Sequence, residues 1–146
     1  MARRLAHICL LLAVFGGVQV ADVVDLRAHH SFGAEYDANK PITLTGVVTK
    51  VEWTNPHVWF YINVKDEKTG EVTNWGAEMG PPHGLQRRGW RRDTLKIGEE
   101  VTVAGSLAKN GSKRMNARQV TLTSTGGRPG ETLDAVSSGG NNSADN

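Results

Sequence analysis

The chemistry for which this sequence is best equipped is metal binding by histidine nitrogen. His29 and His30 stand side by side, and His57 opens an apolar stretch. If His29 is the first residue of the mature chain, its free amine and imidazole can chelate one ion, and His30 adds a second imidazole. An all-nitrogen ligand set suits Cu(II) first and then Ni(II) or Zn(II), because copper leads the affinity order. We therefore predict a copper site at His29 and His30, which His57 completes if the N-terminal segment folds back towards it.

Each of these residues also has a plainer interpretation. His57 could cap a turn or hydrogen-bond a carbonyl, His83 after two prolines could be loop surface, and terminal residues are commonly mobile. Glu78 is a further candidate ligand that no spacing rule selects. The only cysteine, Cys9, lies in an apolar N-terminal run. The spacing of a structural zinc site is therefore absent.

A second group of residues combines arginines with aromatic rings. Its members are Trp59, Tyr61, Arg87, Arg88, Trp90, Arg91 and Arg92, with Trp75 as a further ring. Clustered aromatic and arginine side chains mark docking surfaces. The alternative prediction is therefore a domain that docks a protein or a small ligand. In the plainer interpretation, Trp90 closes one end of the fold and the arginines are solvated or paired with acids.

The sequence contains no motif that indicates catalysis. It has no serine or cysteine nucleophile motif and no glycine-rich phosphate loop. A two-residue site at a chain end also lacks the positioned surroundings that catalysis needs. We predict a non-enzymatic binding module whose only cofactor is copper.

The first 28 residues are typical of a signal peptide. Arg3 and Arg4 precede an uncharged, largely apolar run from Ile8 to Val20. That run is shorter than the ~20 residues of a membrane-spanning helix. The mature protein is therefore predicted to be periplasmic or secreted, without a membrane span.

The cleavage site has two candidates. Cleavage after Ala28 leaves His29 first, but Asp22 and Asp25 separate Ala28 from the apolar run. Cleavage after Ala21 follows that run directly and has a small residue at the cut. Both positions remain open on the local sequence.

Net charge argues against general nucleic-acid binding. The 17 basic and 15 acidic residues give a net charge of +2. Removing residues 1–28 takes away three arginines and two aspartates, which leaves about +1. A charge this small does not attract nucleic acid broadly, so an OB domain that binds nucleic acid is the less favoured function. The expected partner is an unknown protein or small ligand in the periplasm.

Strand signals fill the window from residue 38 to 124. Alternating stretches rich in β-branched residues predict strands at 42–53, 57–65, 72–79, 100–106 and 115–122. A short helix is predicted at 82–88, with a second helical turn from Asp93. Gly46, in the long first strand, predicts a bend or bulge. Three strands, a helix and two strands are the order of a five-stranded OB-like barrel, with an open β-sandwich as the alternative.

The last 21 residues, from Gly126 to Asn146, are rich in Gly, Ser, Asn and Asp. Such a segment buries too little apolar surface to offset the entropy of ordering. The predicted organisation is a signal peptide at 1–28, an OB-like barrel domain at 29–124 and a disordered tail at 125–146.

Four short stretches, "AHHSF", "EWTNPH", "RRGW" and "NAR", carry a family resemblance. From His29 to about Leu122 the sequence resembles the Domain of Unknown Function 6152 family of bacterial proteins. The resemblance implies a small exported β-barrel protein whose mature chain begins at the paired histidines, that is, after Ala28. The extra "DVVDLR" before Ala28 departs from that pattern. The resemblance implies a fold and a compartment, and no activity.

Overall fold

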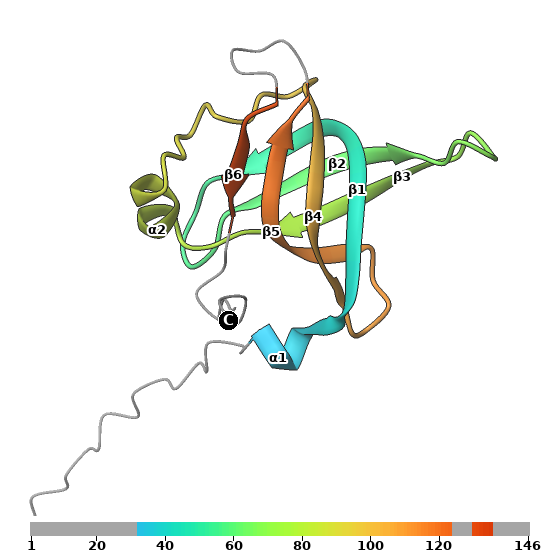
Figure 1. Cartoon of the computed structure of the whole chain (residues 1–146), viewed down its shortest axis with the longest axis horizontal. Helices are drawn as coiled ribbons and strands as arrows, with labels where there is room; N and C mark the ends of the chain where they lie inside the picture. Colours follow the sequence, from blue (N-terminus) through green and yellow to red (C-terminus); the bar gives the residue numbers. More distant parts are fainter. Residues whose placement is uncertain (1–31, 124–129, 136–146) are drawn as a thin grey trace, which may run out of the picture.

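The computed structural model of the chain describes residues 32–123 and 130–135 (Figure 1). In this part the elements are α1 (Phe32–Glu35), β1 (Tyr36–Glu52), β2 (Trp59–Lys65), β3 (Val72–Glu78), α2 (Pro82–Arg87), β4 (Glu100–Ala108), β5 (Arg114–Leu122) and β6 (Thr132–Asp134). The predicted signal peptide and both candidate cleavage sites lie outside the described residues.

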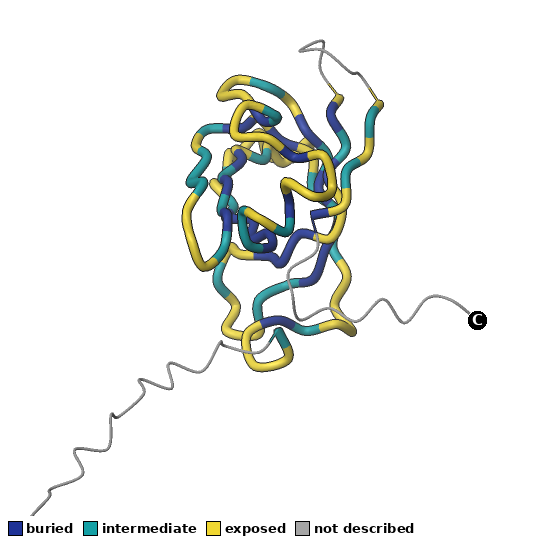
Figure 2. Tube along the Cα trace, turned by 90° about the vertical axis from the view of Figure 1, so that its left-hand side faces the viewer, coloured by how far each residue is buried: buried dark blue, intermediate teal, exposed yellow. Residues whose placement is uncertain are grey.

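Five of the strands close into a barrel. β1 pairs antiparallel with β2 and β4, β2 pairs with β3, and β4 pairs with β5. A parallel pairing of β3 with β5 closes the ring. Figure 2 shows the trace curving round this ring, with buried and exposed segments alternating along it. The predicted five-stranded OB-like barrel is confirmed, and the open sandwich is wrong because the sheet joins its own far strand.

β1 is long because it belongs to two parts of the ring. Its residues up to Val47 pair with β4, and those from Val47 onwards pair with β2. Gly46 stands at this change of partner, where a Cβ atom would lie 2.5 Å from the carbonyl oxygen of Asn63. The backbone of β2 therefore comes too close to Gly46 for a side chain. The bulge itself falls between Val48 and Lys50.

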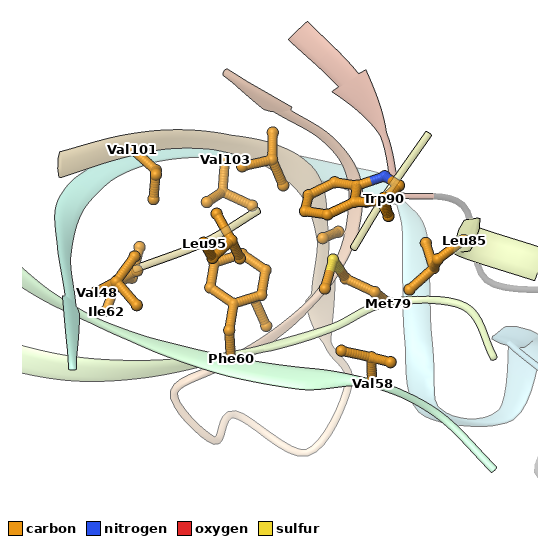
Figure 3. Close-up of a cluster of buried hydrophobic side chains, with 14 of the residues drawn as sticks. Val48, Val58, Phe60, Ile62, Met79, Leu85, Trp90, Leu95, Val101 and Val103 are labelled. Atoms are coloured by element: carbon orange, nitrogen blue, oxygen red, sulfur yellow. The ribbon is translucent and has the colours of Figure 1, made fainter. Parts of the chain in front are cut away.

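The inward faces of the strands make one apolar core. Val58, Phe60 and Ile62 are fully buried, while Trp59 and Tyr61 between them are half-buried on the outside. Figure 3 shows the inward side chains of β1, β2 and β4 meeting in the centre of the barrel. The period-two alternation predicted for β2 is confirmed, because only one face of a strand can reach the core.

Helix α2 and the turn after it deliver Trp90 to that core. Pro82 occupies the first helical position, where its fixed φ suits a helix start. Gly89, with φ of +91°, ends the helix. Trp90 is then 1 % exposed, beside Met79 in Figure 3, and its indole N–H donates to the carbonyl of Asp134 at 2.8 Å. The prediction of Trp90 as part of a binding surface is wrong, because its ring fills the core.

The predicted disordered tail contains a strand. β6 pairs antiparallel with β5, and Leu133 packs against the core. Ala135 is fully buried, and its N–H donates to the carbonyl of Arg118 at 2.7 Å. The prediction of disorder from residue 125 is therefore wrong for 130–135. The apolar side chains of Leu133 and Ala135, together with the indole N–H of Trp90, hold this otherwise polar segment against the barrel.

The other helical segments are short. α1 is a single turn that the strand pattern does not predict, and β1 begins at Tyr36 rather than at Ile42. The loop predicted to be helical from Asp93 contains turns instead, in which Thr94 Oγ1 accepts the Arg91 backbone N–H at 2.8 Å. Among the described residues, no helix has the length and apolar character to cross a membrane.

Candidate functional site

His57 lies just before β2, where it contacts a buried carboxylate. Its Nδ1 is hydrogen-bonded to Glu78 Oε1, and the Tyr36 hydroxyl donates to Glu78 Oε2 at 2.5 Å. Glu78 is 6 % exposed. An ionised carboxylate only accepts hydrogen bonds, so beside an ionised Glu78 the proton lies on His57 Nδ1, and in that neutral tautomer Nε2 keeps its lone pair. We call these three side chains the His57–Glu78–Tyr36 triad.

Strand pairing positions the triad. The register of β2 and β3 sets Glu78 opposite Trp59, on the outward face of the barrel. The ladder continues to Val58, which bonds the segment after β3, so that His57 lies beside Glu78. Tyr36 reaches the same place from the start of β1. The triad therefore joins three segments that are far apart in the sequence.

Glu78 also belongs to a row of buried polar residues that crosses three strands. In the register, Asn116 of β5 lies opposite Glu78, and Ser106 of β4 lies opposite Asn116. Asn116 and Ser106 are 3 % and 1 % exposed. Asn116 faces outwards, because its neighbours Met115 and Ala117 are in the core. Burying a polar group costs free energy unless the group is hydrogen-bonded. Three buried polar residues in one row therefore mark this outward face of the barrel as the candidate site.

The hydroxyl of Tyr36 is held in its neutral form. Burial raises its pKa well above the ordinary value, and the hydrogen bond to Glu78 raises it further. A raised folded-state pKa gives stability that is complete below the unfolded-state pKa and is lost as the pH rises towards the folded-state value. The unfolded-state pKa of a tyrosine is about 10.

We therefore expect the free energy of unfolding to fall above about pH 10, and Tyr36→Phe to remove most of that fall. Urea unfolding between about pH 8 and 11 measures it. Tyr61→Phe is the comparison: burial and Glu52 also raise the pKa of Tyr61, but Tyr61 is the less buried of the two tyrosines, so its removal should lessen the alkaline fall by a smaller amount. An alkaline loss in Tyr36→Phe as steep as in the unaltered protein would contradict this assignment.

The rings of Trp59 and Tyr61 contact cations that the sequence did not single out. The Arg114 guanidinium carbon lies 5.5 Å from the centre of the Trp59 ring, and Lys50 Nζ lies 5.3 Å from that of Tyr61. The Tyr61 hydroxyl donates to Glu52 at 3.1 Å, and Glu52 also pairs with Lys50 at 2.5 Å. The outer face of β2 thus carries two aromatic rings, each with its own cation.

The predicted arginine patch takes no part in these contacts. Arg87, Arg88, Arg91 and Arg92 are all exposed, in α2 and the loop after it. Arg88 lies 4.0 Å from the carboxylate of Asp134. Trp75 is on the opposite face of β3, where it packs against the core and Lys113 lies over its ring. The described contacts connect neither these arginines nor Trp75 with Trp59 and Tyr61.

Of the three predicted metal ligands, the described residues include only His57. His57 is in the triad, His83 is exposed on α2, and His29 and His30 lie outside the described residues. Within 32–123 and 130–135, no three His, Cys, Asp or Glu side chains gather as a metal site would need. Glu78, the further candidate ligand, has one hydrogen bond at each carboxylate oxygen, with His57 at one and with Tyr36 at the other.

Sequence reasoning missed Tyr36, Asn116 and Arg114. Their strands were predicted at least in part, but residue type alone does not distinguish them from other outward positions. The pairing register of β3 with β5 would have identified Asn116 and Arg114.

None of the curated proteins matches this chain. Among solved structures, the chain is similar to a mitochondrial single-stranded DNA-binding protein of S. cerevisiae, Rim1, with 10% identity and a TM-score of 0.47 over 60% of this chain and 96% of that one. It is also similar to a ZRD-deleted mutant of TiaS in complex with agmatine, with 22% identity and a TM-score of 0.42 over 65% of this chain and 26% of that one.

Residues 18–117 match the family of unknown function DUF6152. The match covers more than half of the chain, and Tyr36, His57, Glu78 and Asn116 all lie within it. The chain therefore belongs to the DUF6152 family.

Proposed function

We propose that this protein is an exported, non-enzymatic binding module that holds one Cu(II) ion through His29, His30 and His57. The observation that supports this most is the hydrogen bond between His57 Nδ1 and the buried carboxylate of Glu78. A histidine that binds a metal through one ring nitrogen commonly donates the other to a carboxylate, which orients the ring and makes it a better ligand. His57 Nε2 is thereby suited to a metal, on a side chain that is 23% exposed.

Connectivity supports His29 and His30 as the partners of His57. The Phe32 ring stacks on the ring of Tyr36 with 5.9 Å between centroids, and the Tyr36 hydroxyl bonds Glu78. His30 precedes Phe32 by two residues, which is roughly 7 Å of extended chain. A chain that begins at His29 therefore has its amine within reach of this face. Nitrogen ligands alone favour Cu(II) over Zn(II).

The arrangement suits holding an ion better than catalysis. Glu78 is bonded on both oxygens, by His57 and by Tyr36, so it holds the His57 ring in position for a metal ion. The expected compartment is the periplasm or the medium, which follows from the predicted signal peptide.

N-terminal sequencing and copper titration of the exported protein test the proposal. We expect the mature chain to begin at His29 and to bind one Cu(II), with affinity greatly reduced in a His29→Ala, His30→Ala double variant. His83→Ala is the control, because His83 is an exposed histidine on another element. A mature start at Asp22, or equal copper uptake by the double variant, would refute the proposal.

A further inference from the structure

Arg114 is a cation whose position is set by the barrel and whose charge is not neutralised by the acids of its own face. The parallel pairing of β3 with β5 sets Arg114 opposite Gly76. A Cβ atom at Gly76 would lie 3.3 Å from Tyr61 and 3.6 Å from Trp59, so the absent side chain leaves room for both rings. Arg114 then lies over Trp59, with the guanidinium carbon 5.5 Å from the ring centre.

The carboxylates of this face are already engaged. Glu78 accepts from His57 and Tyr36, and Glu52 pairs with Lys50 and Tyr61. None of the ion pairs between described residues includes Arg114. Within residues 32–123 and 130–135, the exposed guanidinium is held by the Trp59 ring and remains open to a bound anion.

The positive charge of Arg114 acts on both tyrosines. Burial is the largest cause of the raised pKa of Tyr36 and of Tyr61, and the positive charge of Arg114 opposes the rise in both. Arg114 lies two residues before Asn116 on the same face of β5, and Asn116 is opposite Glu78, so the guanidinium is on the same face of the barrel as the triad.

We propose that Arg114, supported by Trp59, is a binding site for a planar carboxylate ligand. A guanidinium presents a flat fork of N–H donors that matches the two oxygens of a carboxylate. Stacking on Trp59 holds the guanidinium in one orientation. The Arg114 side chain therefore loses less conformational entropy when it binds a ligand. The flat rings of Trp59 and Tyr61 beside it favour a planar ligand body. This site goes beyond copper binding and does not depend on it.

The test uses the exported protein freed of metal with a chelator, and benzoate as the probe. NMR spectra should show saturable shifts of the side-chain N–H signals of Arg114 and Trp59. Arg114→Gln should weaken benzoate binding by at least about tenfold, since a charge-assisted hydrogen bond is lost. Arg114→Lys, which keeps the charge without the fork, should also bind benzoate more weakly.

Arg118→Gln is the matched control, because Arg118 is an exposed arginine on the same strand. Absence of saturable shifts, equal loss in Arg118→Gln, or full binding by Arg114→Gln would overturn the site. Tighter binding of inorganic phosphate than of benzoate would overturn the carboxylate assignment. Because no copper is present, each result is independent of whether the chain binds copper.

Discussion

Trp90→Ala is expected to lower the free energy of unfolding by about 3–5 kcal/mol, a large part of the total for a small domain. The ring is 1% exposed and lies among Met79 and Leu85 in Figure 3, so truncation leaves a cavity that strands on both sides cannot fill. It also removes the indole donor to the carbonyl of Asp134. We therefore expect β6 to separate from β5 before the barrel unfolds.

Two further variants separate these contributions. Trp90→Phe keeps most of the apolar volume and loses the hydrogen bond, so it should cost less than the alanine variant. Trp59→Ala is the control for loss of an indole outside the core, where a single cation–π contact is worth about 0.5–1 kcal/mol. Urea unfolding measures all three, and hydrogen exchange of 132–134 reports on β6. A Trp90→Ala variant as stable as Trp59→Ala would show that the core does not depend on this ring.

Glu78→Gln is expected to weaken Cu(II) binding by about 10- to 100-fold without removing a metal ligand. The neutral amide no longer orients and polarises the His57 ring as the carboxylate does, so Nε2 becomes a poorer donor. His57→Ala should weaken binding further, since a ligand itself is lost. Competition with a chelator of known copper affinity measures both, and circular dichroism confirms that each variant is folded.

Glu52→Gln is the matched control for this effect. Glu52 lies on the same face and accepts a hydrogen bond from Tyr61, but it does not contact His57. Copper affinity should be unchanged in this variant. If Glu78→Gln and Glu52→Gln bind copper equally well, the carboxylate of Glu78 has no part in metal binding and the role given to the triad is wrong.

The strands were predicted from local sequence patterns, because the alternation of apolar and polar residues can be recognised within a single strand. In β2 the alternation of Phe60 and Ile62 with Trp59 and Tyr61 is visible in the sequence and is present in the structure. Gly46 lies where the backbone of β2 comes close to β1, and a glycine within a strand can indicate such an approach. His57 was singled out as a metal ligand, and its hydrogen bond with Glu78 was not predicted.

Predictions from average composition were wrong where a few specific contacts decide the structure. The segment after residue 125 is polar overall, yet Leu133 and Ala135 dock on the barrel. Trp90 between arginines looked like part of a binding surface. The turn at Gly89 rotates it into the core instead.

The sequence by itself determined which residues of β2 face inwards and in what order the strands follow, because side-chain alternation has a period of two and needs no knowledge of the partner strand. Only the tertiary structure decided that His57, Glu78 and Tyr36 meet, and that Arg114 covers Trp59. Those contacts depend on the register across paired strands and on the closure of β3 against β5, which the packing of the whole barrel sets.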